Sequence, residues 1–209
     1  MKDVVIFFDL FDTLTTANRG YLEPYFDSEI DKLGDLGILK DSEMAIEEII
    51  KKYPILLQKY TKEEMIGYYE ENMEKSITSI DIDVYNMLDN LKTKGYKLCI
   101  ISDACFTDVA NWRSSPLSLL FDKTIFSCEV GCVKPNSKIY EIAKEIMGNP
   151  KKCIFVGDGG HDELYGASMC EMKTIKANWF VNRSDGKILD YSDYQVDNVK
   201  KLNEIIKEI

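Results

Sequence analysis

The sequence predicts an α/β fold: a three-layer, Rossmann-like parallel sheet with an inserted α-helical cap. From residue 81 onward, short apolar runs of strand length alternate with longer segments of helical period, a pattern typical of right-handed βαβ crossovers. The runs are apolar throughout, as expected for strands that are buried on both faces. A chain of 209 residues is long enough for one core domain and a smaller insert.

The first predicted strand covers residues 4–8 and leads directly into Asp9. Ligands of open α/β sheets bind beyond the carboxyl ends of the strands. Asp9 is therefore a candidate for chemistry, and Asp12 and Thr13 follow it in the next turn.

The segment 17–80 shows helical periodicity with no convincing strand. Apolar residues recur at helical spacing up to Pro54, which stops or kinks a helix. Thr61 and Glu64 then have the spacing of a capping box, which opens another helix. We expect residues 17–80 to form the helical cap, and residues 1–16 and 81–209 to form the α/β core.

Helices and strands alternate after the cap. We expect strands at 97–101, 123–127, 153–156 and 173–176, and helices at 136–147, 162–172 and 199–209. Polar groups stand at the ends of the apolar runs: Ser102 and Asp103 follow 97–101, Lys134 follows 131–133, and Asp158 closes the run that begins at 153.

These groups form an ordered series: a carboxylate, a hydroxyl, an ammonium group and an acidic cluster. The series resembles the four motifs of the haloacid dehalogenase superfamily of hydrolases, most of whose members are phosphatases. The resemblance runs from residue 4 to about residue 177. It implies a helical cap between the first and second motifs.

The resemblance implies a role for each motif. Asp9 is the expected nucleophile, which forms an aspartyl-phosphate. Ser102 and the following backbone amides, at Asp103 and Ala104, are expected to bind phosphoryl oxygens at the start of a helix. Lys134 is expected beside Asp9, where it offsets the negative charge of a bound phosphoryl group. Asp9, Ser102 and Lys134 are thus the catalytic candidates, and Ser102, Asp103 and Lys134 the phosphate-binding ones.

The resemblance also implies a Mg²⁺ ion. The expected ligands are Asp9, Asp158 and the backbone carbonyl of Phe11, joined by Asp162 from the acidic cluster. The spacing leaves open whether Asp162 or its neighbour Glu163 takes that place. The histidine His161 is expected to be a loop or helix-start residue rather than a general base.

One position departs from the family pattern. Most of the phosphatases carry a second Asp two residues after the nucleophile, where this chain has Phe11. That Asp protonates the leaving group, and such help is typically worth ~10²–10⁴ in rate. Asp12 does not simply replace it, because adjacent residues of an extended chain point to opposite sides.

The departure leaves three functions open. The first is a Mg²⁺-dependent phosphohydrolase that acts on a small phosphorylated metabolite. The second is a 2-haloacid dehalogenase, because those enzymes have an aromatic residue at the position of Phe11. They are, however, metal-free, lack the acidic cluster, and carry Asn where this chain has Asp103. The third is a weakly catalytic, phosphate-binding or regulatory protein of the same fold.

Composition excludes several other classes. A formal net charge of −10 argues against a nucleic-acid partner, since nucleic-acid binding relies on basic side chains. Six cysteines without a Cys-x-x-Cys pair predict reduced thiols rather than a zinc site. No apolar run has membrane-spanning length, and the N-terminus does not resemble a signal peptide. We therefore expect a cytoplasmic enzyme with a small-molecule substrate and no membrane partner.

Overall fold

The computed structural model describes residues 3–16, 41–181 and 191–209. Their core is a six-stranded sheet in the order β3-β2-β1-β4-β5-β6, with every neighbouring pair parallel. This confirms the predicted α/β class. The strands are β1 (Val4–Phe8), β2 (Lys97–Ser102), β3 (Lys123–Phe126), β4 (Lys152–Gly157), β5 (Lys173–Ala177) and β6 (Tyr194–Val196).

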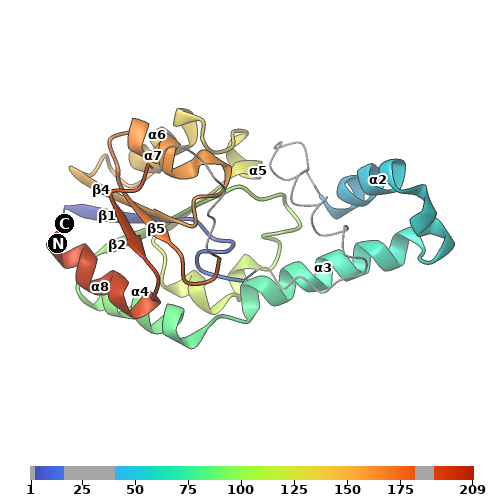
Figure 1. Ribbon diagram of the computed structural model, residues 1–209, viewed down its shortest axis with the longest axis horizontal. Helices are drawn as coiled ribbons and strands as arrows, with labels where there is room; N and C mark the ends of the chain where they lie inside the picture. Colours follow the sequence, from blue (N-terminus) through green and yellow to red (C-terminus); the bar gives the residue numbers. More distant parts are fainter. Residues whose placement is uncertain (1–2, 17–40, 182–190) are drawn as a thin grey trace.

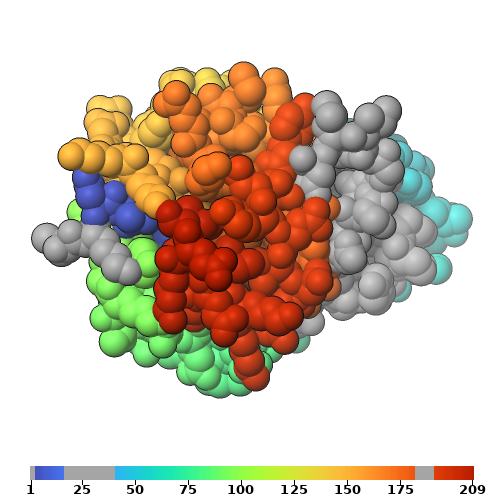
Figure 2. Space-filling view, turned by 60° about the vertical axis from the view of Figure 1, so that its left-hand side comes forward, coloured from blue at the N-terminus to red at the C-terminus, as the bar shows by residue number. Residues whose placement is uncertain are grey.

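Helices cover both faces of this sheet (Figure 1). One face packs against α4 (Ile82–Thr93) and α8 (Val199–Glu208), and the other against α6 (Ser137–Ile146) and α7 (Glu163–Met169). Successive strand residues serve the two faces in turn, so Phe8 packs in the first layer and Phe7 in the second. Figure 2 shows α8, in red, lying beside the green segment that contains α4.

The helices α2 (Ser42–Lys52) and α3 (Lys62–Thr78) lie on the side of the sheet toward which β1 leads (Figure 1). The 3₁₀ helix η1 (Pro54–Gln58) connects them, and the expected capping box of Thr61 and Glu64 opens α3. These helices share an apolar cluster that is separate from the apolar clusters on the two faces of the sheet. We call α2, η1 and α3 the helical unit. Residues 17–40 of the expected cap lie outside the described residues.

The structure corrects two local expectations. Residues 103–111, all of them described, form turns rather than a helix, and the 3₁₀ helices η2 (Trp112–Ser114) and η3 (Pro116–Leu119) come only later. Lys134 does not stand at a strand end. It follows the short helix α5 (Ser127–Val130) and Gly131, whose φ of 69° ends that helix in the left-handed conformation. Among the described residues, no helix is long and apolar enough to cross a membrane.

Candidate active site

Three polar residues lie at one edge of the sheet. Asp9 comes directly after β1, Ser102 is the last residue of β2, and Asp158 comes directly after β4. Both β2 and β4 pair with β1 in parallel, so the carboxyl ends of the three strands meet. The ladder continues past β1, because the Asp9 amide donates to Val156 O at 2.9 Å. All three side chains are buried there.

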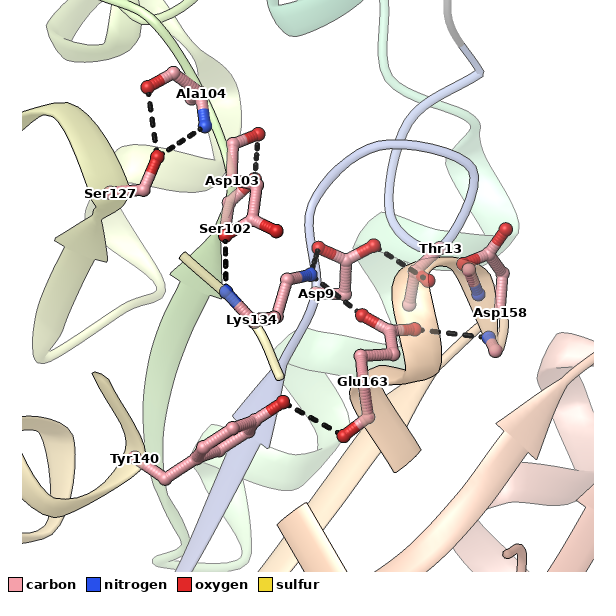
Figure 3. Close-up of polar contacts among 12 residues, drawn as sticks. Asp9, Thr13, Ser102, Asp103, Ala104, Ser127, Lys134, Tyr140, Asp158 and Glu163 are labelled. Carbon is pink, nitrogen blue, oxygen red and sulfur yellow. Dashed lines mark hydrogen bonds and ion pairs between the residues drawn. The ribbon is translucent and has the colours of Figure 1, made fainter. Parts of the chain in front are cut away.

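Lys134 joins two carboxylates at this edge. Its Nζ donates to Asp9 Oδ1 at 2.5 Å and to Glu163 Oε2 at 2.6 Å, as Figure 3 shows. The three side chains are at most 8% exposed. The fold thus brings Lys134 beside Asp9 although the two are 125 residues apart in the sequence.

The buried charges do not balance. Burial, assisted by the charge of Asp158, raises the pKa of Asp9 to about 6, although Lys134 acts in the opposite direction. Burial and the charge of Asp9 raise the pKa of Glu163 well above its ordinary value. Burial alone lowers the pKa of Lys134, but Asp9 and Glu163 raise it well above its ordinary value, so the ammonium group stays charged. Among the described residues, three buried carboxylates therefore lie close together, and one buried lysine is bonded to two of them.

The three carboxylates form a compact group of oxygen atoms. Ligand oxygens of Asp9, Asp158 and Glu163 lie within 4.8 Å of one another. Two backbone amides hold them in place: Gly160 N donates to Asp158 Oδ1, and Gly159 N donates to Glu163 Oε1, each at 3.0 Å. Such a set of oxygens is what hard divalent cations such as Mg²⁺ prefer.

Glu163, and not Asp162, belongs to this group. Asp162, the expected metal ligand, is exposed, whereas Glu163 is 1% exposed. Tyr140 OH donates to the Glu163 carbonyl at 2.8 Å and so fixes the start of α7. The sequence did not identify Tyr140, since its helical spacing indicates only core packing. His161 is exposed and has a φ of 50° in the loop before α7, outside the group.

The end of β2 differs from the expected phosphate site. Ser102 Oγ donates to Asp103 O at 3.4 Å, and the Asp103 carboxylate accepts from the Lys134 amide at 2.9 Å. The Ala104 amide donates to Ser127 Oγ at 3.0 Å and is therefore already bonded. An anion at this point would meet the Ser102 hydroxyl and the Asp103 amide, without a helix N-terminus behind them.

A tight turn positions the residues that follow Asp9. Thr13 Oγ1 donates to Asp9 Oδ2 at 3.4 Å, and Trp179, which follows β5, donates from Nε1 to Thr13 O at 2.8 Å. Phe11 is half-buried and packs against the sheet cluster that faces α4 and α8. Asp12 is buried with a φ of 58°, outside the group of three carboxylates. No sequence pattern pointed to Trp179.

The fold and the site define a Rossmann-like α/β protein that carries a buried aspartate and lysine at the carboxyl edge of its sheet. The family model of the haloacid dehalogenase-like hydrolases matches residues 4–169. The chain belongs to this family.

Individual proteins show how far the similarity extends. A glyceraldehyde 3-phosphate phosphatase from Methanothermobacter thermautotrophicus is 26% identical in an alignment that covers 96% of this chain and 98% of the relative. Among solved structures, a HAD phosphatase from Thermococcus onnurineus has a TM-score of 0.62 at 22% identity, covering 99% of this chain and 98% of that one. The L-2-haloacid dehalogenase from Xanthobacter autotrophicus has a TM-score of 0.73 at 16% identity and full coverage of both chains, 100% each. The two structural matches show the shared fold.

Proposed function

We propose that the protein is a Mg²⁺-dependent phosphohydrolase that acts on a small phosphorylated metabolite through an aspartyl-phosphate on Asp9. The observation that carries this proposal is the buried group of Asp9, Asp158 and Glu163, in which Asp9 and Glu163 are bonded to Lys134. Similarity over nearly the whole chain to proteins named glyceraldehyde 3-phosphate phosphatase also supports it. Triose phosphates and other small phosphate esters are therefore the first substrates to test.

The residues at the site fit a magnesium ion. Every available donor is an oxygen, and three carboxylates with one lysine leave a surplus of negative charge that a divalent cation would offset. Asp9, Asp158 and the backbone carbonyl of Phe11 would hold the ion, and Glu163 would take the place expected for Asp162. When bound, Mg²⁺ screens the repulsion between the Asp9 carboxylate and an anionic phosphate.

The remaining chemistry belongs to the side chains. An Asp9 carboxylate oxygen forms a bond to phosphorus while the bond from phosphorus to the leaving oxygen breaks. Lys134 and Thr13 hold the two Asp9 oxygens in orientation. The Ser102 hydroxyl and the Asp103 amide donate to phosphoryl oxygens. Water then attacks phosphorus, which releases inorganic phosphate and restores Asp9.

A 2-haloacid dehalogenase is the second candidate, and Phe11 is the observation that favours it. A halide leaves without a proton, so an aromatic residue at this position is compatible with its departure. The buried carboxylate of Asp158 and the nearby carboxylate of Asp103 disfavour it, because both would repel a departing halide. A weakly catalytic, phosphate-binding protein is the third candidate, and it too rests on Phe11.

We also propose that residues 17–80 act as a cap that supplies contacts to the leaving group, over a core of residues 1–16 and 81–209. The helical unit has its own apolar cluster, which supports this division. We place the enzyme in the cytoplasm because all six cysteines are unpaired.

A substrate panel tests the proposed function. Triose phosphates, sugar phosphates and p-nitrophenyl phosphate would be assayed with Mg²⁺ and with excess chelator, beside 2-chloropropionate. We expect phosphate release that needs Mg²⁺, is abolished in Asp9→Asn and is strongly reduced in Asp158→Asn. Halide release that survives chelation would instead establish the dehalogenase, and no turnover of any substrate would leave the phosphate-binding protein.

A further inference from the structure

The loop of residues 103–111 is bonded to helix α3 as well as to the core. Tyr69 OH donates to Asp108 Oδ1 at 2.5 Å, and Cys105 N donates to Asp108 Oδ2 at 2.7 Å. One carboxylate therefore receives a hydrogen bond from the helical unit and another from the backbone of the loop that begins right after Ser102.

The apolar contacts of this loop are also made with the helical unit. Cys105 is 3% exposed and belongs to the apolar cluster of the helical unit, not to either sheet cluster. Its Sγ lies 3.6 Å from Tyr69 OH. Burial raises the pKa of the Cys105 thiol to about 12, so this residue packs as a small apolar group and is not a nucleophile.

The core holds the preceding residues of the loop. Ser127 Oγ accepts from the Ala104 amide at 3.0 Å and donates to the Ala104 carbonyl at 3.1 Å. The Asp103 carboxylate accepts from the Lys134 amide. Residues 103 and 104 are thus tied to the core, and Cys105 and Asp108 contact Tyr69 of α3. Little free chain separates the two attachments.

We propose that Tyr69 and Asp108 are positioning residues for the phosphate-binding end of β2. With α3 docked, their hydrogen bond holds the loop so that the Ser102 hydroxyl and the Asp103 amide are set for a phosphoryl group. Substrate binding is then linked to the placement of the helical unit. This proposal rests on the proposed phosphatase function.

The test compares two variants that each remove one hydroxyl group. Tyr69→Phe keeps the ring in its cluster and deletes the bond to Asp108. The matched control is Ser42→Ala, because Ser42 Oγ donates to Glu70 Oε1 at 2.6 Å within the helical unit. The Ser42 amide, which donates to Thr107 Oγ1 at 2.8 Å, is unaffected by that change. Each variant removes one hydrogen bond made by a side chain of the helical unit, but only Tyr69→Phe removes a bond to the loop.

Two measurements are made on the full chain. Hydrogen exchange of the 103–108 amides reports the attachment without any ligand, and we expect it to be about two- to tenfold faster in Tyr69→Phe, as the loss of one hydrogen bond allows. The KM for p-nitrophenyl phosphate and the inhibition constant of inorganic phosphate should rise by a similar factor, with kcat less affected. Ser42→Ala should match the wild type in both measurements.

A second variant tests whether the effect comes from the hydrogen bond itself and not from a general loss of structure. Asp108→Ala removes the acceptors of both Tyr69 and the Cys105 amide, so it should move both measurements in the same direction, and the double variant should be no worse than the worse single one. Unchanged exchange in Tyr69→Phe, or an equal rise in KM in Ser42→Ala, would overturn the positioning role. Absence of phosphate-ester turnover in the wild type would refute the proposed function instead, and the exchange comparison would still decide whether α3 holds the loop.

Discussion

A β-carbon placed on Gly157 would lie 2.1 Å from Glu163 Oε1. The last residue of β4 is thus small because the Glu163 side chain passes directly against its backbone. The contact lets the Glu163 carboxylate reach Lys134 while Gly159 N supports its other oxygen. The glycine before Asp158 is therefore required by packing, because its own φ lies outside the left-handed region.

We predict that Gly157→Ala displaces Glu163 and weakens Mg²⁺ binding by about ten- to a hundredfold, as the loss of a supporting residue around a metal does. A titration of activity against Mg²⁺ measures this. The control is Gly67→Ala in α3, where a β-carbon meets no atom within 4 Å, and there we expect no change in Mg²⁺ dependence. Equal Mg²⁺ dependence of the two variants would mean that Glu163 has no part in the metal site.

The neighbouring acids should differ in their effects. Glu163→Gln removes a charge that is buried beside Lys134, so we expect it to reduce kcat and raise the Mg²⁺ requirement. Asp162→Asn changes an exposed residue and should leave both within about twofold of the wild type. Steady-state kinetics at several Mg²⁺ concentrations separate them. A larger effect of Asp162→Asn than of Glu163→Gln on kcat and on the Mg²⁺ requirement would identify Asp162 as the metal ligand.

Asp9→Asn should abolish turnover and yet stabilise the metal-free protein. The pKa of Asp9 is raised from 3.8 to about 6 in the folded chain. The folded state therefore binds more protons than the unfolded state between these values, and stability falls as the pH rises from about 4 to about 6. At pH 7 in chelator, the variant should be more stable by up to about 3 kcal/mol, with a higher Tm.

The advantage of Asp9→Asn should disappear below about pH 4, where Asp9 is protonated in both states. Adding Mg²⁺ should raise the Tm of the wild type more than that of the variant. If the variant melts below the wild type in chelator at pH 7, the negative charges of the site are already offset without a cation.

Phe11 should make the rate depend steeply on the acidity of the leaving group. No carboxylate at this position protonates the departing oxygen, so aryl and acyl phosphates should react and simple alkyl phosphates should be nearly inert. Phe11→Asp should raise alkyl phosphatase activity by up to about 10²–10⁴. Because Phe11 packs against the sheet cluster, thermal unfolding must be measured beside kcat.

The control for Phe11 is Asp12→Asn, which we expect to be mild. Suppose the wild type already hydrolyses alkyl phosphates and Asp12→Asn removes that activity. Asp12 would then carry the proton, and the interpretation of Phe11 would be wrong.

The strands were predictable where the pattern of apolar residues within the segment itself identifies them. Uninterrupted apolar runs identify β1, β2 and β4, because a strand buried on both faces has no polar positions. The strand β6 has only three residues, too few for a pattern. Turns follow Ser102 in place of the expected helix, and Asp108 in these turns accepts from Tyr69 OH in α3, a contact between distant segments that local sequence does not record.

The site was predictable only in part, for a similar reason. Strand ends located Asp9, Ser102 and Asp158, and the family resemblance rather than spacing indicated Lys134. The preference for Glu163 over Asp162 depends on where α7 begins and on the left-handed backbone of Asp162, with a φ of 54°. Trp179 and Tyr69 act through contacts between distant segments, which no local pattern records.

The most direct test of the account is whether Asp9 becomes phosphorylated during turnover. Wild-type protein and Asp9→Asn would be mixed with Mg²⁺ and an aryl phosphate, quenched in acid within one turnover, and analysed by peptide mass spectrometry. We predict one phosphoryl group on the wild-type peptide that contains Asp9, labile to hydroxylamine and absent in chelator and in the variant. Phosphate release without any phosphorylated peptide, retained in Asp9→Asn, would contradict the account.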